Sequence, residues 1–317
     1  MSTAIAHPNI ALVKYWGKRD LRLNLPAVSS LSLTLDGFRT RTTVERAPTD
    51  RVVVNGATAA GPFASRALQF LNRMVPDRPP VLVHTESNFP AGAGLASSAS
   101  GFAALTLAAA DAFDLPTEPE SLSVWARQGS GSACRSFWGG FVVWDRGERA
   151  DGMDSRGSPL APADHWDLSM VVAIVATGPK SVGSTEGMER SRLTSPFYRT
   201  WVDTAEADVA VGRQAVLDRN LPRLGDVMES STLKMHATMH TARPPILYWQ
   251  PGTIACLHAV SALRAAGTGA WATMDAGPQV KVLCRRSDAA TVAAALAPHA
   301  ASVHMLGPGP RAHLVDP

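Results

Sequence analysis

Short hydrophobic runs and turn-forming residues alternate through the first part of the chain. Valine, isoleucine, threonine and leucine gather in short runs that Gly, Pro, Asp or Asn separate, a pattern typical of β-strands. Hydrophobic residues at helical spacing interrupt these strands. We expect strands over 10–16, 29–35, 41–46, 51–56, 80–87, 139–147 and 168–177, and helices over 64–75, 98–114 and 119–127.

Beyond residue 177 the pattern changes to long segments with helical spacing. Helices are predicted over 198–220, 221–241 and 253–267. Residues 269–286 then predict two strands around an Ala-Gly-Pro turn, followed by a helix and a last strand. Because strands and helices occur in segregated runs, we expect an α+β fold and not a βαβ repeat. We also expect two lobes, residues 1–177 and 178–317.

Composition and charge exclude several classes of protein. The 317 residues are 45% hydrophobic, and the net charge of +3 includes no long basic run that would hold nucleic acid. The longest hydrophobic runs are far shorter than the ~20 residues that cross a membrane, and the N-terminal residues lack the pattern of a signal peptide. Three cysteines without a CxxC pair argue against a disulfide framework or a zinc site and favour a reducing cytoplasm.

A glycine loop between a predicted strand and a predicted helix is the first candidate site. Gly92 and Gly94 allow a close backbone approach, and Ser97, Ser98 and Ser100 fall at the start of the helix. A phosphate there would gain unpaired N–H donors and the positive end of the helix dipole. The segment matches neither GxxxxGK[ST] nor GxGxxG. An anion cradle and a simple N-cap with its loop therefore both stay open.

A second Gly/Ser segment, "RQGSGSACRSFWGG", carries an arginine. Ser130, Gly131 and Ser132 could donate to phosphate oxygens, and the planar fork of Arg135 suits a carboxylate or a phosphate. The alternative is a turn with a surface arginine.

Four further features carry charge or titratable groups. "ALVKYWGKRD" places Lys14, Tyr15, Lys18 and Arg19 together, as a pocket edge or as a solvated strand end, and Lys180 and Ser184 form a polar loop. Asp275 follows a hydrophobic strand and could act as a general base, align a hydroxyl or cap an Asx turn. His236 and His240 lie at i, i+4 with no third ligand nearby, so packing or surface roles are favoured over a metal site.

In their order and spacing, "HPNIALVKYWGKRD", "PAGAGLASSASGFAAL", "RQGSGSACRSFWGGF", "SPFYRTWV" and "TMDAGPQVKVL" closely resemble the diphosphomevalonate decarboxylase family of the GHMP kinase superfamily. The resemblance covers nearly the whole chain. It implies a two-lobed α+β fold whose N-terminal lobe is like the second domain of ribosomal protein S5, and a homodimer. It also implies a lyase of isoprenoid biosynthesis that uses ATP and Mg²⁺ to convert mevalonate diphosphate to isopentenyl diphosphate, ADP, phosphate and CO₂.

The same resemblance implies a role for each motif residue. The ATP-binding residues would be Pro90, Gly92, Gly94, Leu95, Ala96, Ser97, Ser98 and Lys180. The substrate-binding residues would be Lys14, Tyr15, Lys18, Ser130, Gly131, Ser132 and Arg135, and the catalytic residues Asp275, Arg135, Lys18 and Ser184. No set of protein ligands for a metal is predicted.

Two residues depart from the family pattern. Val28 stands where a polar residue is usual, and Gln279 replaces the usual Asn, so a shifted substrate preference is a possible consequence. The alternatives are a kinase or decarboxylase acting on mevalonate 5-phosphate or 3,5-bisphosphate, and a non-catalytic paralogue that binds a metabolite.

Overall fold

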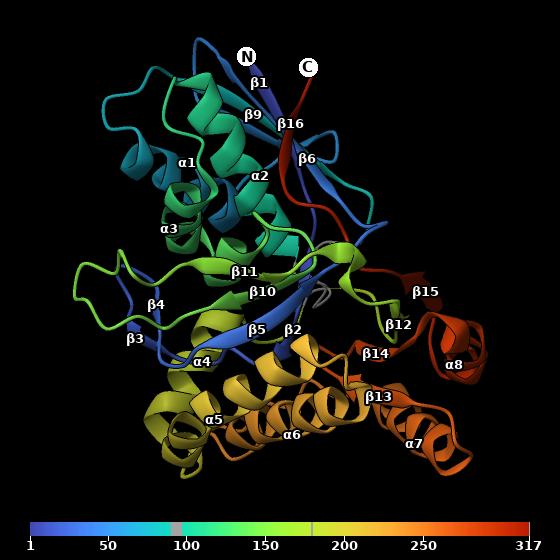
Figure 1. Ribbon diagram of the computed structural model, residues 1–317. Coiled ribbons are helices and arrows are strands. Elements are labelled where there is room, and N and C mark those ends of the chain that lie inside the picture. The colour runs from blue at the N-terminus through green and yellow to red at the C-terminus, as the bar shows by residue number, and fades with distance from the viewer. Residues whose placement is uncertain (90–96, 179, 317) are drawn as a thin grey trace.

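The computed structural model describes residues 1–89, 97–178 and 180–316, and it contains three principal sheets (Figure 1). The first sheet has the strand order β16-β1-β6-β9-β7-β8. Its strands are β1 (Ser2–Ala6), β6 (Thr40–Arg46), β7 (Arg51–Val54), β8 (Ala57–Thr58), β9 (Val81–Ser87) and β16 (His313–Val315). In β6 and β9, buried residues alternate with less buried ones, because one face packs against helices. Those helices are α1 (Pro62–Met74), α2 (Ser97–Ala112) and α3 (Pro119–Gly129).

The second sheet is antiparallel and lies at the centre of the molecule, with the order β11-β10-β5-β2 (Figure 1). Its strands are β2 (Asn9–Val13), β5 (Ser30–Thr34), β10 (Phe141–Trp144) and β11 (Gly157–Ala161). Every residue of β2, β5 and β10 is buried, since both faces of the sheet are covered. The helices α5 (Tyr198–Leu217) and α6 (Leu221–His240) pack against it and contribute to its hydrophobic core. A small hairpin, β3 (Lys18–Asp20) and β4 (Leu25–Pro26), stands at its edge.

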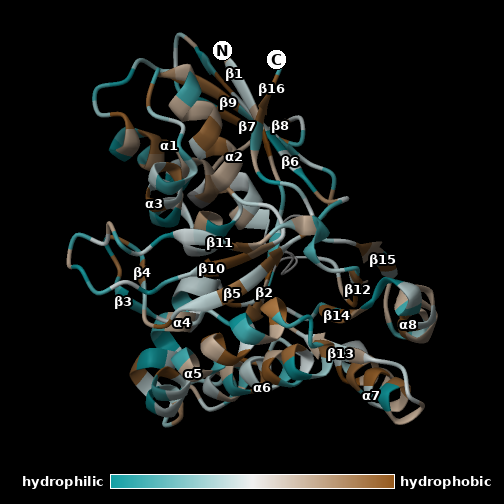
Figure 2. Ribbon diagram, viewed as in Figure 1, coloured by the Kyte–Doolittle hydropathy of each residue, from teal (hydrophilic) through white to brown (hydrophobic). Residues whose placement is uncertain are grey.

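The third sheet has the order β13-β14-β12-β15 and is also antiparallel. Its strands are β12 (Leu168–Ile174), β13 (Ala270–Thr273), β14 (Val280–Arg285) and β15 (Ser302–Leu306). The helices α7 (Pro251–Ala265) and α8 (Ala289–Leu296) cover one face, and α6 contacts β13. Figure 2 shows hydrophobic residues concentrated on central strands such as β10 and β12. Short 3₁₀ segments and α4 (Ser184–Thr194) complete the described chain.

The expected elements are present, and most of the strands are shorter than predicted, although β6 begins one residue earlier. The predicted helices correspond to α1, α2, α3, α5, α6 and α7, with ends that differ by a few residues, and the α+β class is confirmed. The strand expected over 10–16 ends at Val13, so Lys14, Tyr15 and Trp16 lie beyond it. The polar loop expected around Lys180 and Ser184 leads directly into a helix: Ser184 is the first residue of α4.

Two strands bear on how the chain divides. β12 pairs with β14 and β15, and the last strand, β16, pairs with β1 in the first sheet. The expected division at 177/178 stays a prediction, and this pairing favours a boundary before Leu168. Among the described residues, no helix is both long enough and apolar enough to cross a membrane.

Candidate active site

The carboxylate of Asp275 lies between two buried ammonium groups. Lys14 Nζ donates to Oδ1 at 2.7 Å and Lys281 Nζ donates to Oδ2 at 3.0 Å. Both lysine side chains are 1% exposed, whereas that of Asp275 is 25% exposed. Lys14 follows the end of β2, Asp275 follows β13, and Lys281 lies in β14. The site therefore forms where the second and third sheets meet. The Asp275 carboxylate accepts hydrogen bonds from two lysines and does not cap an Asx turn.

Burial and charge act in opposite directions on this cluster. Burial raises the pKa of Asp275, but Lys14 and Lys281 outweigh it and hold that pKa well below its usual range. Burial also lowers the pKa of Lys14 to about 8, although Asp275 opposes this shift. The carboxylate is thus ionised at neutral pH and can accept a hydrogen bond from a hydroxyl on its exposed side. The solvated strand end considered for Lys14 is wrong.

Arg135 is a buried, fixed guanidinium and not a surface arginine. It ends the 3₁₀ segment Gly131–Arg135 and is 2% exposed. Nε donates to Asn9 Oδ1 at 2.9 Å and Nη1 donates to Ser30 Oγ at 2.8 Å. Asn9 also donates to the carbonyl of Ser132 at 3.0 Å, which ties the Gly/Ser segment to β2. Burial lowers the pKa of Arg135 and the Asp275 carboxylate acts against this effect, so the two groups share one electrostatic environment.

The Gly/Ser segment packs against Tyr15 and the start of α2. A Cβ at Gly131 would lie 2.8 Å from Tyr15 Oη and 2.9 Å from the Trp144 ring, so a glycine is needed for this approach. Tyr15 Oη is buried and has no hydrogen-bond partner among the described residues. Ser130 Oγ donates to Ser98 Oγ at 3.2 Å. The structure therefore brings two of the predicted anion-binding segments together.

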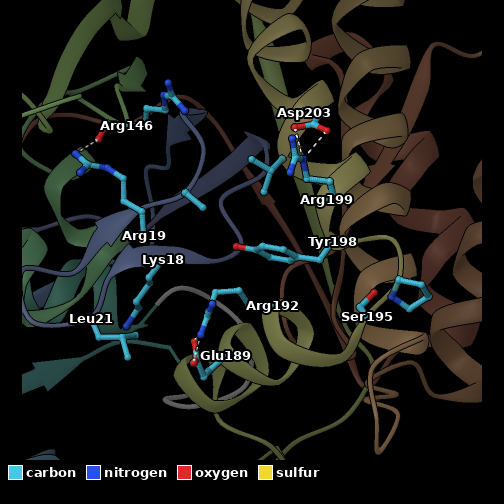
Figure 3. Close-up of a pocket in the computed structure, with 13 residues that line it drawn as sticks. Lys18, Arg19, Leu21, Arg146, Glu189, Arg192, Ser195, Tyr198, Arg199 and Asp203 are labelled. Carbon is cyan, nitrogen blue, oxygen red and sulfur yellow. Dashed lines mark hydrogen bonds and ion pairs between the residues drawn. The ribbon is translucent and has the colours of Figure 1, made fainter.

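Lys180 and Lys18 both contact the first turn of α4, and Lys180 also reaches the residue next to Asp275. Lys180 Nζ donates to Ser184 Oγ at 2.7 Å and to the carbonyl of Ala276, next to Asp275, at 3.1 Å. Lys18 Nζ donates to Thr185 Oγ1 at 3.4 Å. Lys18 also lines a cavity of about 770 Å³ that Tyr198, Glu189 and several arginines complete (Figure 3). Arg19, in contrast, is exposed and donates to two backbone carbonyls.

Two family models together cover most of the chain. The diphosphomevalonate decarboxylase-like N-terminal domain matches residues 6–157, and the mevalonate 5-diphosphate decarboxylase C-terminal domain matches residues 170–305. The chain belongs to the diphosphomevalonate decarboxylase family. The resemblance noted in the sequence is thereby confirmed.

Relatives and solved structures agree with this assignment. The chain is 38% identical to the diphosphomevalonate decarboxylase of Gibberella zeae, over 91% of this chain and 82% of that protein. It is 36% identical to the human diphosphomevalonate decarboxylase, over 88% of this chain and 76% of that protein. A complex of MDDEF with MVAPP, AMPPCP and magnesium superimposes with a TM-score of 0.93 at 37% identity, covering 100% of this chain and 99% of the other. The mevalonate diphosphate decarboxylase of Staphylococcus aureus gives 0.92 at 33% identity, covering 99% and 98%.

The glycine loop expected to bind ATP lies mostly outside the described residues. This applies to Pro90, Gly92, Gly94, Leu95 and Ala96. Ser97 and Ser98 are the first two residues of α2, and a helix N-terminus can receive a phosphate, but their role in ATP binding stays a prediction.

Two residues at the site were missed in the sequence. Asn9 orients Arg135, and Lys281 holds Asp275. Each is a polar residue within a hydrophobic run, "PNIALV" and "QVKVL", and each is 1% exposed. A polar residue in a run that predicts a buried strand is the signal that could have found them.

The two departures from the family pattern are both fully buried. Val28 is 0% exposed in a hydrophobic cluster with Trp16 and Trp201. Gln279 Oε1 accepts from the backbone N–H of Val175 at 2.6 Å, and its Nε2 donates to the carbonyl of Ala176 at 2.6 Å. Both side chains are thus engaged in packing or in backbone hydrogen bonds, and their effect on substrate preference stays a prediction.

Proposed function

We propose that this protein converts mevalonate 5-diphosphate to isopentenyl diphosphate, with release of ADP, phosphate and CO₂, through transient phosphorylation of the C3 hydroxyl. The observation that carries this proposal is the ionised Asp275 carboxylate, held between Lys14 and Lys281 in a chain of the decarboxylase family. Buried Arg135 and Lys180 act on the same carboxylate.

The residues present fit ATP and Mg²⁺. The N-terminus of α2 offers Ser97 and Ser98 to a phosphate, and Lys180 adds a cation beside Ser184. In the described parts of the chain, no group of three or more His, Cys, Asp or Glu side chains could hold a metal. Mg²⁺ commonly binds through substrate phosphates with few protein ligands, so it would be held mainly by the phosphates of ATP. Bound ATP would supply the phosphoryl group, and Mg²⁺ would neutralise its charge.

The substrate's anionic groups have separate partners. Arg135, fixed by Asn9 and Ser30, presents a planar fork for the carboxylate. The family resemblance supports a role in binding the diphosphate and its neighbouring atoms for Lys14, Tyr15, Lys18, Ser130, Gly131 and Ser132. The buried Tyr15 hydroxyl, which has no partner in the described parts of the chain, is available to donate to a phosphate oxygen.

Asp275 then acts on the tertiary hydroxyl at C3. Its ionised carboxylate accepts the hydroxyl hydrogen bond, orients O3 for phosphorylation and takes up the hydroxyl proton as the O3–P bond forms. After phosphorylation the C3–O bond breaks, and the electron pair of the bond to the carboxylate forms the new C=C bond as CO₂ leaves. Arg135 holds that carboxylate in the orientation that this elimination needs. Lys180 and Ser184, which are hydrogen-bonded to each other next to Asp275, would stabilise the departing phosphate.

The test follows ADP and CO₂ together with ATP and each candidate substrate: mevalonate 5-diphosphate, 5-phosphate and 3,5-bisphosphate. We expect both products from the diphosphate. ADP without CO₂ would mean a kinase, and neither product would mean a metabolite-binding paralogue. Asp275→Asn should lower kcat by several orders of magnitude with KM little changed, and Arg135→Ala should raise KM as well. The exposed Asp164→Asn is the matched control, with normal kcat and KM.

We further infer a cytoplasmic homodimer. The family resemblance supports the dimer, and three free, buried cysteines, Cys134, Cys256 and Cys284, suit a reducing compartment. Light scattering coupled to size exclusion tests the dimer directly.

A further inference from the structure

We propose that Lys281 is a positioning residue that, together with Lys14, keeps the Asp275 carboxylate charged and aimed at the substrate hydroxyl. The proposal rests on the proposed function and adds a residue to it. Lys281 Nζ is buried behind Asp275 and donates to its Oδ2 at 3.0 Å, so it acts on the substrate hydroxyl through that carboxylate.

The position of Lys281 in its strand calls for a charged partner. β14 is an inner strand of its sheet, where Lys281 lies opposite Val172 on β12 and Thr273 on β13. Its neighbours Val280 and Val282 belong to the hydrophobic cluster under α7 and α8. Because side chains alternate along a strand, Lys281 projects to the opposite face, toward Asp275. An ammonium group that is 1% exposed is retained at such a position only when it is paired.

Each lysine donates a hydrogen bond to a different oxygen of the Asp275 carboxylate. Lys14 donates to Oδ1 and Lys281 to Oδ2, so the pair fixes the plane of the carboxylate as well as its charge. With one lysine alone, the carboxylate could rotate about its Cβ–Cγ bond. Two donors from two sheets prevent this rotation and leave the exposed edge in one orientation.

Charged and titratable groups from several elements surround Asp275. The groups that act on this cluster are Lys14 after β2, Lys281 on β14, Lys180 before α4, Arg135 after α3 and His236 on α6. Burial lowers the pKa of Lys14 to about 8, so Lys14 begins to lose its charge just above neutral pH. Burial also lowers the pKa of His236 to about 3, which leaves it neutral there. Lys281 supplies the second direct contact.

The test compares the pH dependence of kcat in the wild type, Lys281→Met and Lys281→Arg. Loss of a cation in direct contact should raise the pKa of Asp275 by about one to three pH units. In Lys281→Met, the fall of kcat at low pH, the acid limb of the profile, should therefore begin at a higher pH than in the wild type, by that amount. At neutral pH, kcat should be reduced about 10-fold or more, and KM for ATP should stay within about twofold of the wild-type value. Lys281→Arg should restore the limb toward its wild-type position. Arg285→Met, at the exposed end of the same strand, should match the wild type.

An NMR titration of Asp275, which needs no catalytic turnover, gives a second measurement of the effect of Lys281. The ¹³C carboxyl resonance of Asp275, identified by its loss in Asp275→Asn, should titrate at higher pH in Lys281→Met than in the wild type. Should Lys281→Met fail to fold, Lys281→Arg and Lys281→Gln carry the comparison. An unshifted acid limb and an unshifted resonance in a folded, charge-removing variant overturn the proposal. A wild type that releases neither ADP nor CO₂ overturns the proposed function instead, while the resonance still tests the role of Lys281.

Discussion

Buried cationic side chains serve two different purposes in this molecule. Arg127 is 0% exposed and donates to the backbone carbonyls of Leu23, Gly152 and Ser155, so its guanidinium holds loops together. Arg135, eight residues later in the chain, is held by the side chains of Asn9 and Ser30. A guanidinium that donates to several backbone carbonyls, as in Arg127, stabilises the fold. A guanidinium that side chains hold at the edge of a site, as in Arg135, still has N–H groups that can donate to a ligand.

His236 is the buried residue whose protonation should limit stability in acid. It is 1% exposed, packs against Trp249 with ring centroids 5.0 Å apart, and neither ring nitrogen has a hydrogen-bond partner among the described residues. Burial, assisted by the charge of Lys14, lowers its pKa to about 3 from 6.5. The unfolded chain therefore binds a proton between these values that the folded protein does not. Stability is full above pH 6.5 and is lost as the pH falls toward 3.

We predict that His236→Leu reduces this acid sensitivity. Between pH 7 and pH 5 the wild type should lose about 2 kcal/mol of unfolding free energy through His236, and the variant should not. Urea unfolding at both values measures the difference, and contributions from His7 and His240 cancel in the comparison. His258→Leu, at an exposed position of α7, should keep the wild-type pH dependence. An equal loss in His236→Leu and wild type would contradict the role assigned to this histidine.

Helices and strands with a clear periodicity of hydrophobic residues were predictable from the sequence, but the contacts between these elements were not. Helical spacing located α5 and α6 within a few residues. The strand predicted over 10–16 continued the hydrophobic pattern through Trp16, but β2 ends at Val13. The chain turns at Gly17, whose φ of 104° suits glycine and where an added Cβ would overlap the Tyr198 side chain. Because β2 ends at Val13, the direction of the Lys14 side chain is not set by the alternation of side chains along the strand.

The pairing at the site depends on how elements pack. Lys14 and Asp275 are 261 residues apart, and no local pattern indicates that β2 and β13 bring them within 2.7 Å. The family resemblance named both residues, but it did not indicate Lys281, whose side chain matters only through the register of β14. A lysine within a hydrophobic run marks position 281 as unusual, but its contact with Asp275 depends on long-range register, which the packed sheets set.

Gln279 links two elements, and we predict a structural effect when it is shortened. Its amide bonds the backbone of Val175 and Ala176, beyond the end of β12, from the turn before β14. Gln279→Asn is one methylene too short to keep both hydrogen bonds, so unfolding free energy should fall by about 1–2 kcal/mol. KM for the diphosphate substrate should stay within about twofold. Gln214→Asn, exposed on α5, should change neither quantity, and a changed KM with unchanged stability would instead support a role in substrate preference.

At the scale of the whole molecule, the C-terminal segment connects the third sheet to the first. After β15 the chain crosses the central sheet, where the N–H of Gly309 donates to the carbonyl of Thr34 at 2.7 Å and the carbonyl of Gly309 accepts from the N–H of Gly140 at 3.0 Å. It then forms β16 beside β1, so the two ends of the chain lie together in one sheet (Figure 1). The C-terminal segment is therefore hydrogen-bonded to the central sheet at Thr34 and Gly140 before it joins the first sheet.

Gly309 is the narrowest point of that crossing, and Gly309→Ala tests its importance. An added Cβ would overlap the backbone of Leu35 and Asp36, which cannot move aside as a flexible side chain could. We expect a loss of about 1–3 kcal/mol of unfolding free energy, the usual cost of overpacking, with faster proteolysis of the last strand. In Gly307→Ala the nearest atoms are the side-chain ends of Arg286 and Asp36 at 3.1 Å, so this control should lose much less. Equal stability of the two variants would show that the crossing tolerates displacement, and that packing between the sheets alone holds Lys14 and Lys281 on Asp275.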